Sequence, residues 1–363
     1  MRGYLAIKNI GLFSGCYFGW DGPCSGEVAH FHSRGFCWDI LTDPAYHKKI
    51  VITDKVYVED KSPLSEDSQS FMPHLSAIVF LGSIRKSSLS SSSSDEGLEE
   101  YLRTNRITGF IPDRKDLLFD TLRFVSCATA GLAPDPGDAL DGSRIPATYN
   151  TDDLKWVSIP QEYLWDLSPI DVPEEKHNIV VWDFGTGYGL LRTFRKNGCR
   201  IRVVPPYTPP EDIVALHPDG IIISGSPLSP SSAREIIPRV ERVIGIRPIL
   251  GVGGGAITLA EALGIEISEL ENPHHGSAIP VETIGTGRIS ATYQTHSLTP
   301  GAISVEKAGC AITDINVCDE SVEGFINDEY NIIGALYSDA FGESPAYLAG
   351  FNQILEKSAT NSL

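Results

Sequence analysis

The sequence lacks the cysteine spacing that holds disulfide frameworks or zinc. Its seven cysteines are scattered, odd in number, and never form a Cys-x-x-Cys pair. Small disulfide scaffolds use paired cysteines, and many structural zinc sites place two cysteines within a few residues of each other. This pattern argues against both kinds of site and fits a reducing compartment such as the cytosol.

Positive charge and long apolar runs are also scarce. The chain has 29 lysines and arginines against 47 aspartates and glutamates, a net charge of −18. Such a surface repels nucleic acid and anionic lipid, which are themselves negatively charged. No apolar run reaches the roughly 18 residues that suggest a membrane span, and residues 1–8 are typical of a strand rather than a signal peptide. We therefore expect a cytoplasmic protein that binds neither nucleic acid nor membrane.

The length of 363 residues favours two domains over one, and the sequence divides into parts of different character. Residues 1–150 hold short β-branched or alternating runs and one amphipathic helical pattern at 97–104, which predicts a mostly β or α+β domain. Residues 151–176 indicate a packed linker, and 359–363 a tail. Apolar runs alternate with helical patterns across 177–358, which predicts βαβ units around a buried parallel sheet. The expected fold class is therefore α/β, with strands at 4–10, 49–58, 77–81, 179–182, 201–204, 220–223 and 248–252, and later helices at 190–196, 211–216, 233–244 and 257–263.

Residues 180–189 (VVWDFGTGYG) raise the question of a cofactor. Their glycines resemble loops that hold adenosylmethionine or a dinucleotide. Both kinds of site use an acidic residue at the end of the next strand to bind ribose hydroxyls, whereas residues 202–206 read Arg-Val-Val-Pro-Pro. We therefore interpret the glycines as packing residues of a tight turn and expect no cofactor.

Gly253 is the most informative residue. It follows the apolar run that ends at Val252 and precedes a helical pattern, at the kind of turn that exposes a catalytic nucleophile beside a helix N-terminus. The stretch resembles the nucleophile elbow of class I glutamine amidotransferases, in which a cysteine stands at the position of Gly253. Glycine has no side chain that could attack a carbonyl.

Further motifs resemble the small subunit of carbamoyl phosphate synthetase, and they occur in that family's order along nearly the whole chain. They are residues 26–28 (GEV), 39–46 (DILTDPAY), 183–185 (DFG), 217–220 (HPDG), 224–227 (SGSP), 274–276 (HHG), 294–296 (QTH) and 322–324 (VEG). Their order identifies the chain as a member of this family. The resemblance implies a small-subunit N-terminal domain followed by a flavodoxin-like class I glutamine amidotransferase domain.

The resemblance also implies that the chemistry has been removed. The family hydrolyses glutamine with a cysteine nucleophile, a histidine base and a glutamate that orients the histidine. Gly253 stands at the cysteine position, Ser338 at the histidine position and Ala340 at the glutamate position. Removing a single member of such a triad typically costs on the order of 10⁴–10⁶ in rate. We therefore expect no catalytic residues here, only vestigial positions.

The glutamine pocket implied by the resemblance is altered as well. Ser226 replaces a glycine of the oxyanion hole and Ile257 replaces a glutamine that holds substrate, while Ser33 still matches. The vestigial pocket positions carried over from the family are Ser33, Ser226, Gly254, Ile257, Thr295, Ser297 and Leu298.

The sequence offers candidate residues for two other kinds of site, a new hydrolase site and a metal site. Ser338 and Asp339 could form a new hydrolase with a histidine base, if folding supplied the hydrogen-bond geometry; the candidate bases are His274, His275 and His296. Adjacent histidines diverge on most backbones, so the pair at 274 and 275 is a poor metal site. His30 and His32 share a face of an expected strand, and we interpret them as ordinary polar residues. We therefore expect no metal site.

Three functions remain open. The chain can be an inactive homologue that acts as a binding, scaffold or regulatory protein, with a synthetase large chain or another protein as its partner. It can instead be a working small subunit that supplies ammonia for carbamoyl phosphate, for pyrimidine or arginine synthesis, or a hydrolase with new residues. The third function is a small-metabolite sensor that uses the vacated pocket.

Overall fold

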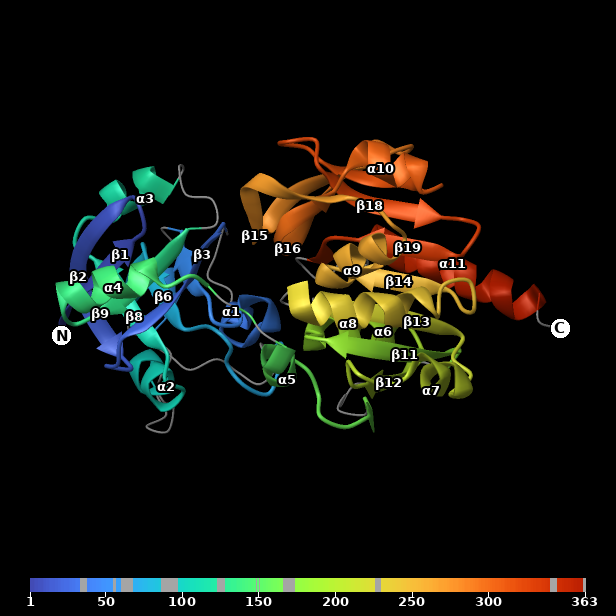
Figure 1. The fold of residues 1–363 in the computed structure, drawn as a ribbon, viewed down its shortest axis with the longest axis horizontal. Helices are drawn as coiled ribbons and strands as arrows, with labels where there is room; N and C mark the ends of the chain where they lie inside the picture. Colours follow the sequence, from blue (N-terminus) through green and yellow to red (C-terminus); the bar gives the residue numbers. More distant parts are fainter. Residues whose placement is uncertain are drawn as a thin grey trace. The chain divides into compact units, whose positions relative to one another are not determined.

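The computed structural model describes residues 1–32, 38–54, 57–59, 68–85, 97–122, 128–147, 149, 151–165, 174–225, 230–339 and 345–361. The chain forms two compact units (Figure 1). The first comprises Met1–Thr148 with Glu271–Ser277, and the second comprises Tyr149–Leu270 with Ala278–Leu363.

The first unit is a closed barrel, coloured blue to green in Figure 1, with the strand order β1-β2-β8-β6-β4-β3-β9. Its strands are β1 (Arg2–Ile7), β2 (Gly11–Gly19), β3 (Cys24–Phe31), β4 (Ile50–Thr53), β6 (Ala77–Phe80), β8 (Thr108–Pro112) and β9 (Thr129–Ala133). Alternate residues such as Ile50, Ile52 and Val79 fill the barrel core, as the period of two along a strand requires. The strands expected at 4–10 and 77–81 are confirmed, although β1 ends before Asn9, whose φ of 64° forms the turn into β2. The strand expected at 49–58 was wrong in its length, because β4 ends at Thr53 and β5 (Tyr57–Glu59) belongs to a separate sheet with β7 (Ser83–Arg85).

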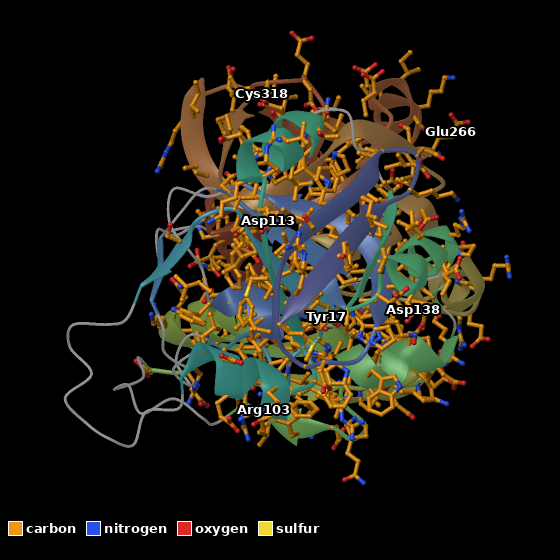
Figure 2. All side chains as sticks on the ribbon, turned by 90° about the vertical axis from the view of Figure 1, so that its left-hand side faces the viewer. Tyr17, Arg103, Asp113, Asp138, Glu266 and Cys318 are labelled. Carbon is orange, nitrogen blue, oxygen red and sulfur yellow. The ribbon has the colours of Figure 1, made fainter. Side chains whose placement is uncertain are left out.

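Closure of the barrel buries polar groups as well as apolar ones. Tyr17 of β2, labelled in Figure 2, is 1% exposed. Its hydroxyl donates to the Gly22 carbonyl oxygen at 2.5 Å, and burial raises the pKa of Tyr17 to about 12. Gly3 makes room for this ring, because a Cβ at Gly3 would lie 2.7 Å from the Tyr17 side chain.

Short helices and a small second sheet accompany the barrel. They are α1 (Asp39–Thr42), η1 (Pro44–Tyr46), α2 (Leu98–Thr104), α3 (Lys115–Leu122) and α4 (Pro136–Arg144), together with strands β5 (Tyr57–Glu59) and β7 (Ser83–Arg85). The helix expected at 97–104 is confirmed as α2, whereas α3 and α4 were not expected. The start of α4 carries a recognisable signal, because Asp135 caps the backbone N–H groups of Gly137 and Asp138 and Pro136 opens the helix.

The second unit is built on one sheet with the order β10-β12-β11-β13-β14-β19-β18-β17-β15-β16-β20. Strands β12 (Cys199–Val204), β11 (His177–Phe184), β13 (Gly220–Gly225), β14 (Ile249–Val252) and β19 (Ile332–Ala335) are parallel neighbours. The other strands are β10 (Tyr163–Leu164), β15 (Ile267–Thr283), β16 (Arg288–Pro300), β17 (Ala311–Asn316), β18 (Val322–Asn327) and β20 (Ser338–Asp339). The predicted α/β fold class and buried parallel sheet are confirmed.

Helices cover both faces of this sheet, which is why its central strands are apolar throughout. They are α6 (Tyr188–Lys196), α7 (Pro210–Ala215), α8 (Pro230–Glu241), α9 (Gly254–Ala262), α10 (Ala302–Lys307) and α11 (Ala346–Asn361). On β11, Val180 and Trp182 pack in the core that contains α8 and α9 residues. Ile179 and Val181 pack in the core that contains α6 and α11 residues. The expected helices α6 to α9 are confirmed with small shifts at their ends.

The segment expected to be a packed linker begins with the elements η3 (Thr151–Asp153) and α5 (Leu154–Val157), and β10 follows. Leu154 and Val157 are buried in the core of the second unit. Among the helices of the described residues, none has the length and apolar character needed to cross a bilayer.

The first unit contains a buried histidine that makes folding sensitive to acid. Burial, together with the nearby His47, lowers the pKa of His74 from 6.5 to about 3. Between these values the unfolded chain binds a proton that the folded chain excludes, so this group's contribution to stability is complete above pH 6.5 and declines as pH falls toward 3.

We predict that the free energy of unfolding falls between pH 7 and pH 4 in the wild type by a few kcal/mol more than in His74→Gln. The size follows from the shift in the pKa of His74, because each pKa unit corresponds to about 1.4 kcal/mol. Urea unfolding at several pH values measures the difference. His177→Gln, at the partly exposed start of β11, is the matched control and should keep the wild-type pH dependence. Equal pH dependence in wild type and His74→Gln would contradict the prediction.

Candidate functional site

The strand-to-helix turn expected at Gly253 is present in the second unit. Strand β14 ends at Val252, α9 begins at Gly254, and Gly253 between them has φ 57° and ψ −125°. The Gly253 N–H donates to the Ala335 carbonyl oxygen at 2.8 Å, and its own carbonyl oxygen accepts from the Ala256 N–H at 3.0 Å. A sharp, strained turn of this kind presents the nucleophile in α/β hydrolases. The backbone of a nucleophile elbow is therefore present without a side chain.

Glycines beside the elbow hold α9 directly against the sheet. A Cβ at Gly255 would lie 2.0 Å from the Ile223 carbonyl oxygen, and one at Gly251 would lie 2.8 Å from the Ala256 Cα. A Cβ at Gly253, by contrast, would meet none of the described residues within 4 Å. Among these residues, only the backbone conformation favours glycine at 253.

Sheet topology brings the ends of three parallel strands to one edge beside Gly253. Ser224 pairs with Val252 on the parallel strands β13 and β14, and Val252 pairs with Ala335 on β14 and β19. Gly253 follows β14 directly at this edge. Ligands of open α/β sheets bind at this edge. Ser33, Ser226 and Ala340 lie outside the described residues.

Ser338, at the position of the family's histidine, belongs to the short strand β20. It pairs with Tyr293 of β16 and lines a small hollow of about 40 Å³ together with Arg288, Thr292 and Tyr337. Tyr337 is buried, and burial raises the pKa of its hydroxyl. Ser338 thus lies beside a hollow with room for water.

The pocket positions on α9 and β16 are partly absorbed into the hydrophobic core. Ile257 is 6% exposed within that core, and Leu298 packs against the same cluster. Thr295 and Ser297 are half-buried on β16. A glutamine side chain needs hydrogen-bond partners when it leaves water, and neither isoleucine nor leucine supplies one.

His296, one of the candidate bases, binds groups of the second unit. Its Nδ1 lies 2.8 Å from the Leu298 carbonyl oxygen, an acceptor, so Nδ1 carries the proton. Its Nε2 lies 3.2 Å from Oε2 of Glu323, a fully buried carboxylate on β18. Asn316 donates to the other oxygen of that carboxylate at 3.4 Å. His296 and Glu323 therefore face each other from β16 and β18.

His274 and His275, the other candidate bases, fall in the segment that belongs to the first unit. Both are buried. The His275 carbonyl oxygen accepts from the His32 N–H at 2.8 Å. The centroid of the His275 ring lies 5.7 Å from that of the Tyr46 ring. These contacts give His275 a packing role within the first unit.

Comparison with known proteins agrees with this architecture. Residues 180–336 match the family model of class-I glutamine amidotransferases. The carbamoyl phosphate synthase small chain of Syntrophotalea carbinolica is 29% identical over 336 residues, which cover 89% of each chain. That of Akkermansia muciniphila is 28% identical and covers 95% of this chain and 94% of its own length. The chain is thus similar to carbamoyl phosphate synthase small chains over most of its length, and residues 180–336 form a class-I glutamine amidotransferase domain.

Solved structures resemble this small-chain homologue more distantly. A putative GMP synthase component from Thermoplasma acidophilum has a TM-score of 0.42 and 17% identity, and the match covers 52% of this chain and 98% of that one. A glutamine amidotransferase from Thermotoga maritima has a TM-score of 0.36 and 14% identity over 51% of this chain and 83% of its own.

The glycine-rich turn of this small-chain homologue has a structural explanation. Asp183, at the end of β11, accepts from the N–H groups of Gly185 at 2.9 Å and Thr186 at 2.7 Å. Its other oxygen accepts from the Ile159 N–H at 2.8 Å. Burial raises the pKa of Asp183, while these three donors oppose the rise. The carboxylate therefore holds the turn and the segment before β11.

Sequence reasoning missed one polar cluster entirely. His30 and His32 were expected to share a face, and in the structure Asp54 joins them. The missing signal was the parallel pairing of β3 with β4, which no local pattern encodes.

We predict that Gly253→Ala lowers the free energy of unfolding by about 1–3 kcal/mol, because alanine strains the backbone at this φ while meeting no neighbour. Gly255→Ala should cost more, because its Cβ would collide with the Ile223 carbonyl. Gly264→Ala is the matched control for the cost of a positive φ alone, since Gly264 also has a positive φ and a Cβ there would meet none of the described residues within 4 Å. Chemical denaturation gives the change in the free energy of unfolding for each of the three variants. A loss for Gly253→Ala as large as that for Gly255→Ala would contradict the prediction.

Proposed function

We propose that this chain is a catalytically inactive homologue of the carbamoyl phosphate synthase small chain that acts as a binding, scaffold or regulatory protein. The observation that carries the proposal is Gly253, which occupies the elbow between β14 and α9 without offering a nucleophile. Acyl transfer from an amide needs a thiolate, hydroxyl or equivalent group at that point.

The remaining positions support the same conclusion. Ser338 and Ala340 replace the base and the orienting carboxylate. Ile257 and Leu298 are apolar and lie in or against the hydrophobic core, whereas a glutamine substrate would need hydrogen-bond partners. Residual catalysis after loss of a triad comes from the oxyanion hole and from substrate binding, and these changes weaken substrate binding as well.

The partner we propose is a large synthetase chain. The relatives are named as small chains, which implies a larger chain with which each assembles. This homologue aligns over most of their length, which supports a similar assembly. A protein that keeps the fold and loses the chemistry can still regulate or stabilise its partner.

Two enzymatic alternatives need chemistry that the geometry does not favour. A glutamine-hydrolysing small chain that supplies ammonia for carbamoyl phosphate would need a nucleophile at Gly253. A new hydrolase would need Ser338 beside an available base, and His296 is engaged with Leu298 and Glu323.

A small-metabolite sensor is the second candidate function, favoured by the hollow beside Ser338. Arg288, Thr292 and Tyr337 line it with Ser338, so a cationic residue and three hydroxyl-bearing residues border one small hollow. Such convergence of a few polar groups is typical of small-molecule sites.

We predict that the purified chain releases no more glutamate from glutamine than its Gly253→Ala variant, because both lack a nucleophile at the elbow. The assay should be run with and without a large chain. Ser338→Ala and His296→Ala serve as controls for a substitute mechanism. Glutamate release by the wild type that either control abolishes would show a working enzyme and end the proposal.

We predict that the chain forms a stable complex with a carbamoyl-phosphate-synthase large chain from the same genome. Size-exclusion chromatography with light scattering measures the mass of the mixture. Gly253→Ala should bind equally well, because the proposed role does not use the elbow. If mixtures elute only as the separate chains, the assignment of this partner is wrong.

A further inference from the structure

A cluster of metal-ligand side chains lies at one end of the barrel in the first unit. Strand β3 pairs in parallel with β4, with His30 opposite Ile52 and Phe31 opposite Thr53. His32 and Asp54 are the next residues of the two strands, so His30, His32 and Asp54 project to the same side of the sheet. Ile52 on that side belongs to the barrel core. The three polar groups therefore close one end of the barrel interior.

The ligand atoms of these residues converge on one point. His30 Nε2 lies 2.9 Å from Oδ1 of Asp54, and His32 Nδ1 lies 3.5 Å from Oδ2. The two imidazole rings are 4.1 Å apart between centroids. All the ligand atoms lie within 4.8 Å of one another.

These separations suit a tetrahedral cation. Zinc binds imidazole nitrogen and carboxylate oxygen at about 2.0–2.2 Å, and tetrahedral geometry then puts neighbouring ligand atoms about 3.3–3.6 Å apart. The 3.5 Å between His32 Nδ1 and Asp54 Oδ2 falls in this range, whereas the 2.9 Å between His30 Nε2 and Oδ1 is shorter and involves the other carboxylate oxygen. A side-chain rotation that places both nitrogens around one oxygen would admit an ion.

The backbone around the cluster is held in place. The His32 N–H donates to the His275 carbonyl oxygen at 2.8 Å, and the His32 carbonyl oxygen accepts from the Ser277 N–H at 3.0 Å. The His30 ring packs edge-on against Phe119 of α3 at 5.9 Å. Supporting contacts of this kind orient metal ligands before an ion arrives.

We propose that His30, His32 and Asp54 form a binding site for a first-row divalent cation, with zinc as the best match. Two imidazoles and one carboxylate are a ligand set of zinc sites that keep a fourth position for water. The His32 side chain is 56% exposed, whereas those of His30 and Asp54 are 15% and 21% exposed. Water therefore reaches the fourth position past His32. The site is separate from the elbow and does not depend on the proposed function.

The test is a zinc titration of the full chain, measured by isothermal titration calorimetry after a chelator has removed bound metal. We expect one equivalent of zinc to bind, at least tenfold more weakly in Asp54→Asn and in His32→Gln. The double variant should lose this equivalent. His177→Gln removes an imidazole outside the cluster and should bind zinc as the wild type does.

Cobalt(II) provides a second readout, because a tetrahedral site with nitrogen and oxygen ligands gives it a strong visible absorption. The wild type and His177→Gln should show this absorption, and His32→Gln should lose it. Circular dichroism of the metal-free proteins establishes that the variants fold, and the exposed His32 makes that variant the safest. Unchanged zinc affinity and stoichiometry in the double variant, or no zinc binding by the wild type, overturns the proposal.

Discussion

The second unit depends on the close contact between α9 and the sheet beneath it. Gly255 lies so near the Ile223 carbonyl that a Cβ there would come within 2.0 Å of the oxygen. This contact lets α9 bury Ala256, Leu259 and Ala260 in the core. The chain can pass from β14 into a helix seated so closely only through a sharp turn, and Gly253 forms that turn. Packing thus imposes the shape of the elbow whether or not it bears a nucleophile.

Shape and chemistry at this site have different physical origins, which explains how one can persist without the other. The elbow is held by backbone hydrogen bonds from Gly253 to Ala335 and from Ala256 to Gly253. Neither Gly253 nor Ser338 belongs to the hydrophobic cores of the unit. The packing therefore does not depend on a nucleophilic side chain at 253, and glycine there avoids backbone strain. The proposed role as a binding protein follows from this separation.

The barrel follows a different constraint, in which strand pairing places polar groups at its end. The residues before the cluster, Val28 and Ile50 among them, fill the interior. Continuation of the same strands by two or four residues carries His30, His32 and Asp54 to the region where solvent begins to reach the side chains. Polar groups at such a boundary keep their hydrogen bonds without the full cost of burial.

Local patterns were enough for much of this chain. The apolar runs of β11 to β14 and the helical periods of α6 to α9 predicted their elements, because residues buried on both faces of a parallel sheet are apolar throughout. Gly253 was recognisable from its place between such a run and a helix. Helices α3 and α4 were missed, and in α4 the glycines within the helix weaken its pattern.

The sequence by itself determined the family resemblance and the order of most elements of the second unit, because these depend on local pattern and motif order. Only the tertiary structure decided that Ile257 and Leu298 share a core, that His296 faces Glu323, and that Asp54 meets His30 and His32. Each of these contacts joins residues far apart in the chain. Strand pairing and helix packing create such contacts, and neither is visible in any short stretch of sequence.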